Sequence, residues 1–279
     1  MPIISWLSEL YEKNWGKLEV AYGDAGRLPE HIVALTTNDD AARRGALLEI
    51  QHAIMAEDLK FEAALHVTPF LLNLLRDNLT VERLEILRLL RRLTFGNEHE
   101  YIFGYFSPEE HRDGSDTGHL GDRDGTTIGV YNKVMDGISI YLGLLRMGDV
   151  QERLQAAALL SYFPDRATET VPHLLDHMHD ETDPAVVATI EIALGILGRG
   201  AAPDVRPTLL ERLHHTQTIV RWGAAIGVSW DGIPDTPGVV DLLEECASAD
   251  RTPIPFMNGS TGLLADWLIH RESRAEPSF

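Results

Sequence analysis

The chain has 279 residues and carries 24 Lys and Arg against 43 Asp and Glu, a formal net charge of −19. With 44% apolar residues it can bury a substantial core, which excludes an acidic disordered chain. A surface this acidic lacks the cations that displace counterions from nucleic acid, and it repels anionic membranes, so we expect neither as a partner.

The sequence contains no obvious targeting, membrane or cysteine-based element. No apolar run approaches the ~18 residues that cross a bilayer, and the first ten residues lack the basic flank and cleavage site of a signal peptide. Cys246 is the single cysteine, which excludes an internal disulfide and a cysteine zinc site. We therefore expect a cytoplasmic protein without a metal or cofactor.

The N-terminal part predicts a cap followed by paired helices. Residues 1–27 form the expected cap, with a helix over 1–18 that carries Trp6, Leu7, Leu10 and Tyr11. Residues 28–95 then form the first repeats, because apolar residues recur there at helical spacing.

The repeat is visible in segments that begin at Asp39, Leu79, Asp149, Asp183 and Gln217, the last three of which are 34 residues apart. Each begins as a capped amphipathic helix does. The fifth residue is an arginine in four of the five segments: Arg43, Arg83, Arg153 and Arg221. We expect these arginines to join neighbouring units by ion pairs to acidic residues of the turns.

Most of these segments follow a stretch with a proline near the expected first turn, and in three of the four stretches a pair of leucines follows the proline. These stretches lie at 29–35, 67–75, 171–178 and 205–213. Proline suits the first turn of a helix, so the unit reads as helix–turn–helix. One such pair cannot bury its apolar face alone, whereas stacked pairs can.

The Asp39/Arg43 and Asp149/Arg153 spacing, with the Pro-x-Leu-Leu first helices, resembles bacterial HEAT-repeat proteins with short, Ala-rich repeats. The resemblance covers about residues 28–245. It implies an all-α fold, a right-handed α-α superhelix of the HEAT/ARM solenoid type. It leaves the function open, because a solenoid is a generic binding scaffold.

A long insertion at 96–126 interrupts the repeat, and we predict that it is a partner-binding loop. Long loops in compact domains are usually functional or disordered. The insertion combines aromatic residues, which make large interface contacts, with acids that steer a basic partner. The residues are Tyr101, Phe103, Tyr105, Phe106, Glu109, Glu110, Asp113, Asp116, Asp122 and Asp124. The alternative is that the aromatic residues only pack the loop back onto the repeats.

Residues 127–245 predict further repeats, starting with one helix over about 127–147. Glu191 stands where the other units have Leu or Ala, so it must be paired or exposed. We expect it to be exposed, and we include it as an acidic contact for a partner. Trp222 aligns with apolar residues and should lie in the core. Residues 246–279 predict a C-terminal cap, with a helix over 257–273.

Catalytic patterns are weak. His173 and His177 have the i, i+4 spacing that can chelate a metal, but a third ligand is lacking on their helix, and we expect a solvated face. No nucleophile, base and orienting group stand at a suitable spacing, so we predict no catalytic residues and no enzyme.

We therefore predict a protein-binding module. The resemblance and the charge favour an immunity-type inhibitor of a basic toxin, such as a nuclease. One alternative is a cytoplasmic scaffold or regulator that binds a basic protein or peptide. Another is a HEAT-like enzyme of the lyase or DNA glycosylase type.

Overall fold

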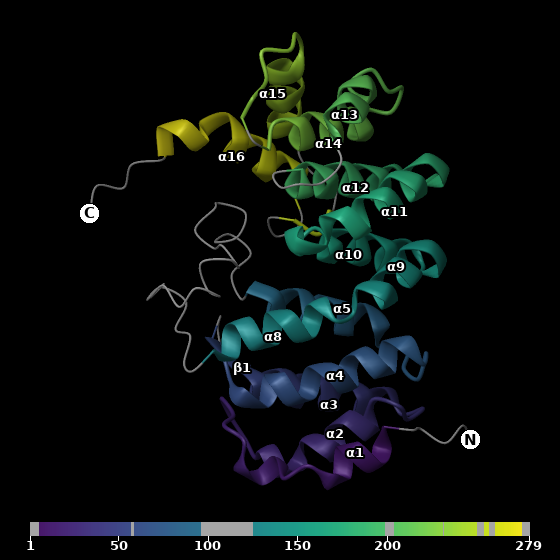
Figure 1. Ribbon diagram of the computed structural model, residues 1–279, viewed down its shortest axis with the longest axis vertical. Helices are drawn as coiled ribbons and strands as arrows, with labels where there is room; N and C mark the ends of the chain where they lie inside the picture. The colour runs from purple at the N-terminus through teal and green to yellow at the C-terminus, as the bar shows by residue number, and fades with distance from the viewer. Residues whose placement is uncertain are drawn as a thin grey trace. The chain divides into compact units, whose positions relative to one another are not determined.

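The computed structural model describes residues 6–56, 59–95, 125–198, 204–230, 232–249, 254–256 and 260–274. Within these ranges the chain forms fourteen α-helices and one short hairpin of two strands, which confirms the predicted all-α class (Figure 1). No helix in these ranges combines the length and the apolar character needed to span a membrane. The chain divides into two compact units, Met1–Ile140 and Tyr141–Phe279.

The first unit consists of short helical turns, paired helices and the hairpin. Its helices are α1 (Leu7–Glu12), α2 (Leu28–Ala34), α3 (Asp40–Ile54), α4 (Glu62–Arg76), α5 (Arg83–Phe95) and α8 (Thr126–Met135). Two 3-10 turns lie at Trp15–Lys17 and Ala25–Arg27. The antiparallel hairpin pairs β1 (Met55–Ala56) with β2 (Leu59–Lys60), Met55 opposite Lys60.

The N-terminal segment packs on α4, and its helix is shorter than predicted. The Trp6 and Trp15 rings lie 5.7 and 5.8 Å from the ring of Phe70. Trp15 donates its indole N–H to the carbonyl of Leu10 at 2.6 Å. Helix α1 carries Tyr11 as predicted, and the side chain of this residue is 62% exposed.

The second unit repeats the helical pair. Its helices are α9 (Ile138–Met147, which begins at the end of the first unit), α10 (Val150–Leu160), α11 (Ala167–Asp180), α12 (Pro184–Leu197), α13 (Arg206–Arg212), α14 (Thr218–Val228), α15 (Val239–Ala249) and α16 (Thr261–Arg274). A 3-10 turn lies at Pro164–Arg166. Helix α12 packs against both α10 and α14, and α13 packs on α14 (Figure 1).

Four of the five predicted second helices begin where the sequence pattern placed them. Asp39, Asp149 and Asp183 are the N-caps of α3, α10 and α12, and each carboxylate accepts at least one hydrogen bond from a backbone N–H group of the first turn. Gln217 occupies the same position before α14, without a side-chain cap. A carboxylate at this place satisfies N–H groups that have no partner inside the helix.

Three of the predicted arginines make one recurring contact. Arg43, Arg153 and Arg221 each donate from Nη1 to a backbone carbonyl of the turn that precedes their helix, over 2.9, 3.0 and 3.1 Å. Arg43 also pairs with Glu82 at 3.1 Å, and Arg153 pairs with Glu181 at 2.7 Å. The predicted ion pairs to acidic residues near the turns are confirmed for these two arginines.

The predicted register at Leu79 is wrong. Helix α5 begins at Arg83 itself, so this arginine is the first helical residue and does not lie one turn inside the helix. Arg83 donates to the side-chain oxygen of Asn78 at 2.9 Å. The preceding acid, Glu82, instead accepts from Arg43 of α3. The arginine matches those of the other segments, but the helix starts at Arg83, four residues after Leu79.

Two further boundaries differ from the prediction. The helix expected over 127–147 is divided into α8 and α9 at Asp136 and Gly137, because glycine is a poor helix former. Pro69 and Pro172 lie inside α4 and α11, not in the first turn. Helix α4 begins seven residues before its proline, so the proline did not mark the start of the helix.

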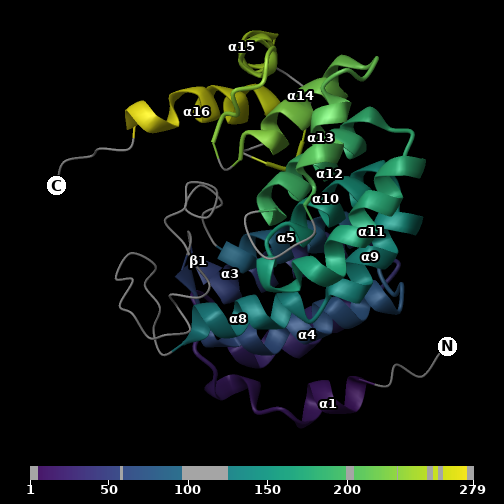
Figure 2. The ribbon, with the colours of Figure 1, turned by 45° about the horizontal axis from the view of Figure 1, so that its top comes forward.

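The C-terminal part ends in two contacting helices, α15 and α16 (Figure 2). The sequence predicted the second of them as a cap. Leu264 and Leu268 of α16 are buried, while Leu263 is 53% exposed. The Trp267 ring lies 6.1 Å from that of Trp230, which follows α14. Helix α16 also packs on α14.

Candidate functional site

The site begins with the crossing of α12 and α14, where three glycines let the two backbones approach closely. A Cβ on Gly223 would lie 2.6 Å from the Cα of Ala188, and a Cβ on Gly227 would lie 2.5 Å from the backbone oxygen of Glu191. A Cβ on Gly195 would overlap the backbone of Gly227. Only glycine fits at these positions, so the crossing has no room for side chains.

Glu191 lies inside this crossing. Its side chain has no exposed surface, so the expectation that it is exposed is wrong. Oε1 accepts a hydrogen bond from Nε of Arg212, the last residue of α13. Arg212 supplies the pairing that the sequence required as the alternative to exposure. A partner has no access to Glu191 in this arrangement, and we do not retain it as a partner contact.

The second carboxylate oxygen of Glu191 is not satisfied. Oε2 is buried and has no hydrogen-bond donor among the described residues. It would lie 2.6 Å from a Cβ at Gly223, so it points at the glycine face of α14. Burial raises the pKa of Glu191 to about 8, against the opposing hydrogen bond and charge of Arg212.

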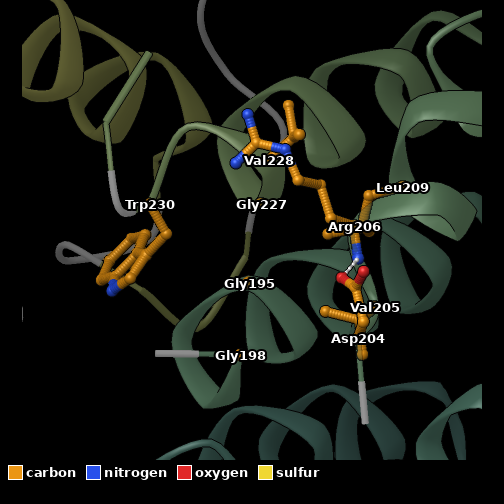
Figure 3. Close-up of a pocket in the computed structure, with 9 residues that line it drawn as sticks. All are labelled: Gly195, Gly198, Asp204, Val205, Arg206, Leu209, Gly227, Val228 and Trp230. Carbon is orange, nitrogen blue, oxygen red and sulfur yellow. Dashed lines mark hydrogen bonds between the residues drawn. The ribbon is translucent and has the colours of Figure 1, made fainter. Parts of the chain in front are cut away.

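A small pocket of about 120 Å³ opens one helical turn further along the crossing (Figure 3). Gly195, Gly198 and Gly227 contribute backbone to its lining. The other lining residues, several of which belong to α13 or directly precede it, are Asp204, Val205, Arg206, Leu209, Val228 and Trp230.

The polar groups of the pocket point in different directions. Asp204 accepts the backbone N–H of Arg206 at 3.1 Å. Figure 3 shows the side chain of Arg206 extending away from Asp204 and toward Val228, with Trp230 on the other side. The guanidinium can donate to a carboxylate or a carbonyl of a bound group. The buried ring of Trp230 supplies apolar surface.

Two histidines of α11, His173 and His177, contact other side chains of the same unit. His173 lies 3.0 Å from the guanidinium of Arg146, and His177 Nε2 lies 3.1 Å from a carboxylate oxygen of Glu181. Their i, i+4 spacing places the two rings beside different partners. In the described part of the chain no group of three His, Cys, Asp or Glu residues is placed to hold a metal ion.

Glu181 is the centre of the best-connected polar cluster. It accepts two hydrogen bonds from Arg153, at 2.7 and 3.1 Å, and one each from the backbone N–H groups of Thr182 and Asp183 at 2.9 Å. Burial would raise its pKa, but the bonds from Arg153 and the backbone outweigh that effect and lower the pKa. This cluster joins α10 to the turn between α11 and α12.

The predicted loop residues lie outside the described part of the chain. They are Tyr101, Phe103, Tyr105, Phe106, Glu109, Glu110, Asp113, Asp116, Asp122 and Asp124. Their partner-binding role stays a prediction.

Sequence reasoning missed several residues of the crossing. Gly223 and Gly227 have the four-residue spacing that allows close helix contacts, and this signal was visible in the sequence. Arg212 carried no such signal, because its partner is 21 positions away. Trp222, predicted for the core, is only half-buried, and its indole nitrogen has no hydrogen-bond partner among the described residues.

Comparison with protein families, with curated proteins and with solved structures finds no match for this chain.

Proposed function

We propose that the chain is a HEAT-type solenoid whose helical pairs stack as a right-handed superhelix. Two observations support the repeat. The N-caps of α3, α10 and α12 are aspartates at matching positions. Arg43, Arg153 and Arg221 repeat one hydrogen bond to the preceding turn. A contact that recurs with the sequence period is what stacked, nearly identical units produce.

On this scaffold we propose a protein-binding function. Specifically, we propose that the chain is a cytoplasmic, immunity-type inhibitor of a basic toxin. The observation that carries the proposal is the net charge of −19, which results from 43 acidic and 24 basic residues. Such a field accelerates association with a basic partner and disfavours nucleic acid. Aromatic residues of the insertion, with the acids that follow them, supply contacts for that partner.

The polar groups of the described residues are used for structure more than for chemistry. Glu181 and Arg153 join neighbouring helices, and Arg212 pairs with Glu191 inside the helix crossing. These roles favour binding over catalysis. They leave the loop and the exposed acids as the groups available to a partner.

The test is inhibition of a defined target. Basic nuclease domains of secreted toxins are titrated with the purified chain, and nuclease activity and association rate are measured from about 50 to 300 mM salt. We expect stoichiometric inhibition by one of them, with an association rate that falls steeply with salt. We also expect co-expression of the chain to rescue growth of cells that produce that nuclease.

Two variants of the loop separate its roles. Serine at Tyr101, Phe103, Tyr105 and Phe106 should accelerate dissociation, because buried aromatic contacts hold a complex together. Amides in place of the six loop acids should mainly slow association. Binding of a basic protein without inhibition would favour the scaffold alternative. If no basic protein binds, the proposed function is wrong.

A further inference from the structure

One arginine of the second unit has no partner for its charge. Side chains are described for six arginines of this unit, and five of them bond to other groups of the unit: Arg146, Arg153, Arg166, Arg212 and Arg221. The guanidinium of Arg206, the sixth, makes neither a hydrogen bond nor an ion pair with the described residues. Since acids outnumber bases by 43 to 24 in this chain, an unpaired guanidinium is available to a ligand.

Arg206 lines the pocket of Figure 3, which lies where two helices end. Gly195 and Gly198 belong to the last turn and the C-cap of α12, and Gly227 and Val228 are the last two residues of α14. The C-terminal end of a helix carries partial negative charge and favours a cation or a hydrogen-bond donor. Because three of these four residues are glycines, a ligand can approach the backbone there.

Asp204 adds a full negative charge to the lining. One of its carboxylate oxygens accepts the backbone N–H of Arg206 at 3.1 Å, which holds the carboxylate beside the start of α13. The side chain of Arg206 extends away from Asp204 (Figure 3). The two opposite charges therefore stay apart although they belong to nearby residues, and the pocket offers both an anionic and a cationic group.

The rest of the lining is apolar and leaves a small space. Val205, Leu209, Val228 and Trp230 are buried residues that line the pocket. Its volume of about 120 Å³ is smaller than the roughly 150 Å³ of an apolar cavity that holds benzene. This space suits a branched group of three or four carbon atoms better than an aromatic ring.

We propose that this pocket binds a free amino acid with a small, branched apolar side chain, such as valine. The carboxylate pairs with the guanidinium of Arg206, and the ammonium group donates to Asp204. The side chain contacts Leu209 and Trp230. A ligand of this class complements both charges of the lining. It has no net charge, so the field of a chain at −19 does not repel it as it repels a simple carboxylate or a phosphate.

The experiment compares L-valine with three analogues, each of which lacks one feature. Isovalerate lacks the ammonium group, isobutylamine lacks the carboxylate, and glycine lacks the side chain. Titrations of the isotope-labelled chain follow the indole N–H signal of Trp230 by NMR at constant ionic strength, and Trp230→Phe assigns this signal. We expect a saturable shift with L-valine. Each analogue should bind at least about tenfold more weakly, because it loses a charged hydrogen bond or the burial of three carbon atoms.

Two pocket variants and two matched controls locate the site. Arg206→Gln and Asp204→Asn should each weaken L-valine binding by about tenfold or more. Asparagine keeps a side-chain oxygen that can accept the N–H at the start of α13. Arg146→Gln and Asp176→Asn remove the same charges from exposed residues of the same unit that do not line the pocket, and they should bind as wild type does. Circular dichroism verifies that each variant keeps its helices.

Several results would overturn the proposal. No saturable shift with L-valine, or unchanged affinity in both pocket variants, would show that the pocket is not the site. Equal affinity for isovalerate or isobutylamine would show that a single charge is recognised, and equal affinity for glycine would show that the apolar lining is not used. The proposal concerns a small molecule and goes beyond the inhibitor function, which is measured separately with toxin domains.

Discussion

Alanine at Gly227 tests the close crossing of α12 and α14. The added Cβ would lie 2.5 Å from the backbone oxygen of Glu191, and no rotamer change can relieve a contact with backbone. The helices must separate by at least a few tenths of an ångström along their glycine faces. Overpacking of this kind typically costs about 1–3 kcal/mol. We expect a net loss near 2 kcal/mol, because alanine also contributes up to about 1 kcal/mol of helix propensity.

Gly143→Ala is the matched control. Gly143 lies in α9 of the same unit, is exposed, and has no atom within 4 Å of an added Cβ. The same substitution should therefore stabilise the protein there by about 0.5–1 kcal/mol through propensity and a less flexible unfolded chain. The difference between the two variants, about 3 kcal/mol, isolates the helix contact from the effect of the residue type.

The assay is urea unfolding followed by far-ultraviolet circular dichroism, with thermal unfolding as a second readout. At about 2 kcal/mol lost, the melting temperature of Gly227→Ala should fall by roughly 4–8 °C. Both variants should retain the helical spectrum. Equal stability of Gly227→Ala and Gly143→Ala would refute the reasoning, because it would mean that the crossing of α12 and α14 has room for the added methyl group.

Three other predictions use different measurements. Arg153→Met should cost about 3 kcal/mol of unfolding free energy, because it leaves Glu181 buried without its cation. Arg221→Met should cost about 1 kcal/mol, because Arg221 donates to two backbone carbonyls and the Thr218 hydroxyl, which are neutral. Because its folded pKa is lowered, Glu181 stabilises the fold above its ordinary pKa near 4.5 and loses this effect as the pH falls, so Glu181→Gln should weaken the acid dependence of denaturant unfolding. Duplex DNA should show no measurable binding in gel-shift titrations at physiological salt, since a surface of −19 releases few counterions.

Local signals were read correctly from the sequence, and this explains why the helical frame could be predicted. An N-cap aspartate depends on backbone groups two or three residues away, as at Asp39 and Asp183. The recurring arginines also reach only to the adjoining turn for their carbonyl acceptor. The start of each such helix is therefore encoded by residues close to it in sequence. The recurrence of these residues every 34 positions made the pattern recognisable.

The candidate site depended on contacts that short stretches do not encode. Burial of Glu191 follows from the approach of α14 and α13, which lie later in the chain. Glu191 stands where the other repeats have Leu or Ala, which singled it out in the sequence. The sequence could not identify Arg212 as its partner. The start of α5 was predicted wrongly for a related reason. Glu82 stands just before α5, but it pairs with Arg43 of α3, so its role depends on another helix and not on its own segment.

Internal pairing also bears on the choice of partner. Arg43, Arg153 and Arg212 are each committed to an acid within the protein, namely Glu82, Glu181 and Glu191. Each pair removes one cation and one anion from the groups that a partner can meet, so the net charge of −19 is unchanged while the remaining ratio of acids to bases increases. Exposed charges interact over about 8–10 Å in physiological salt. A partner that approaches this surface therefore meets the same excess of carboxylates but fewer competing cations, which fits the proposed basic partner and makes its association rate the quantity most sensitive to salt.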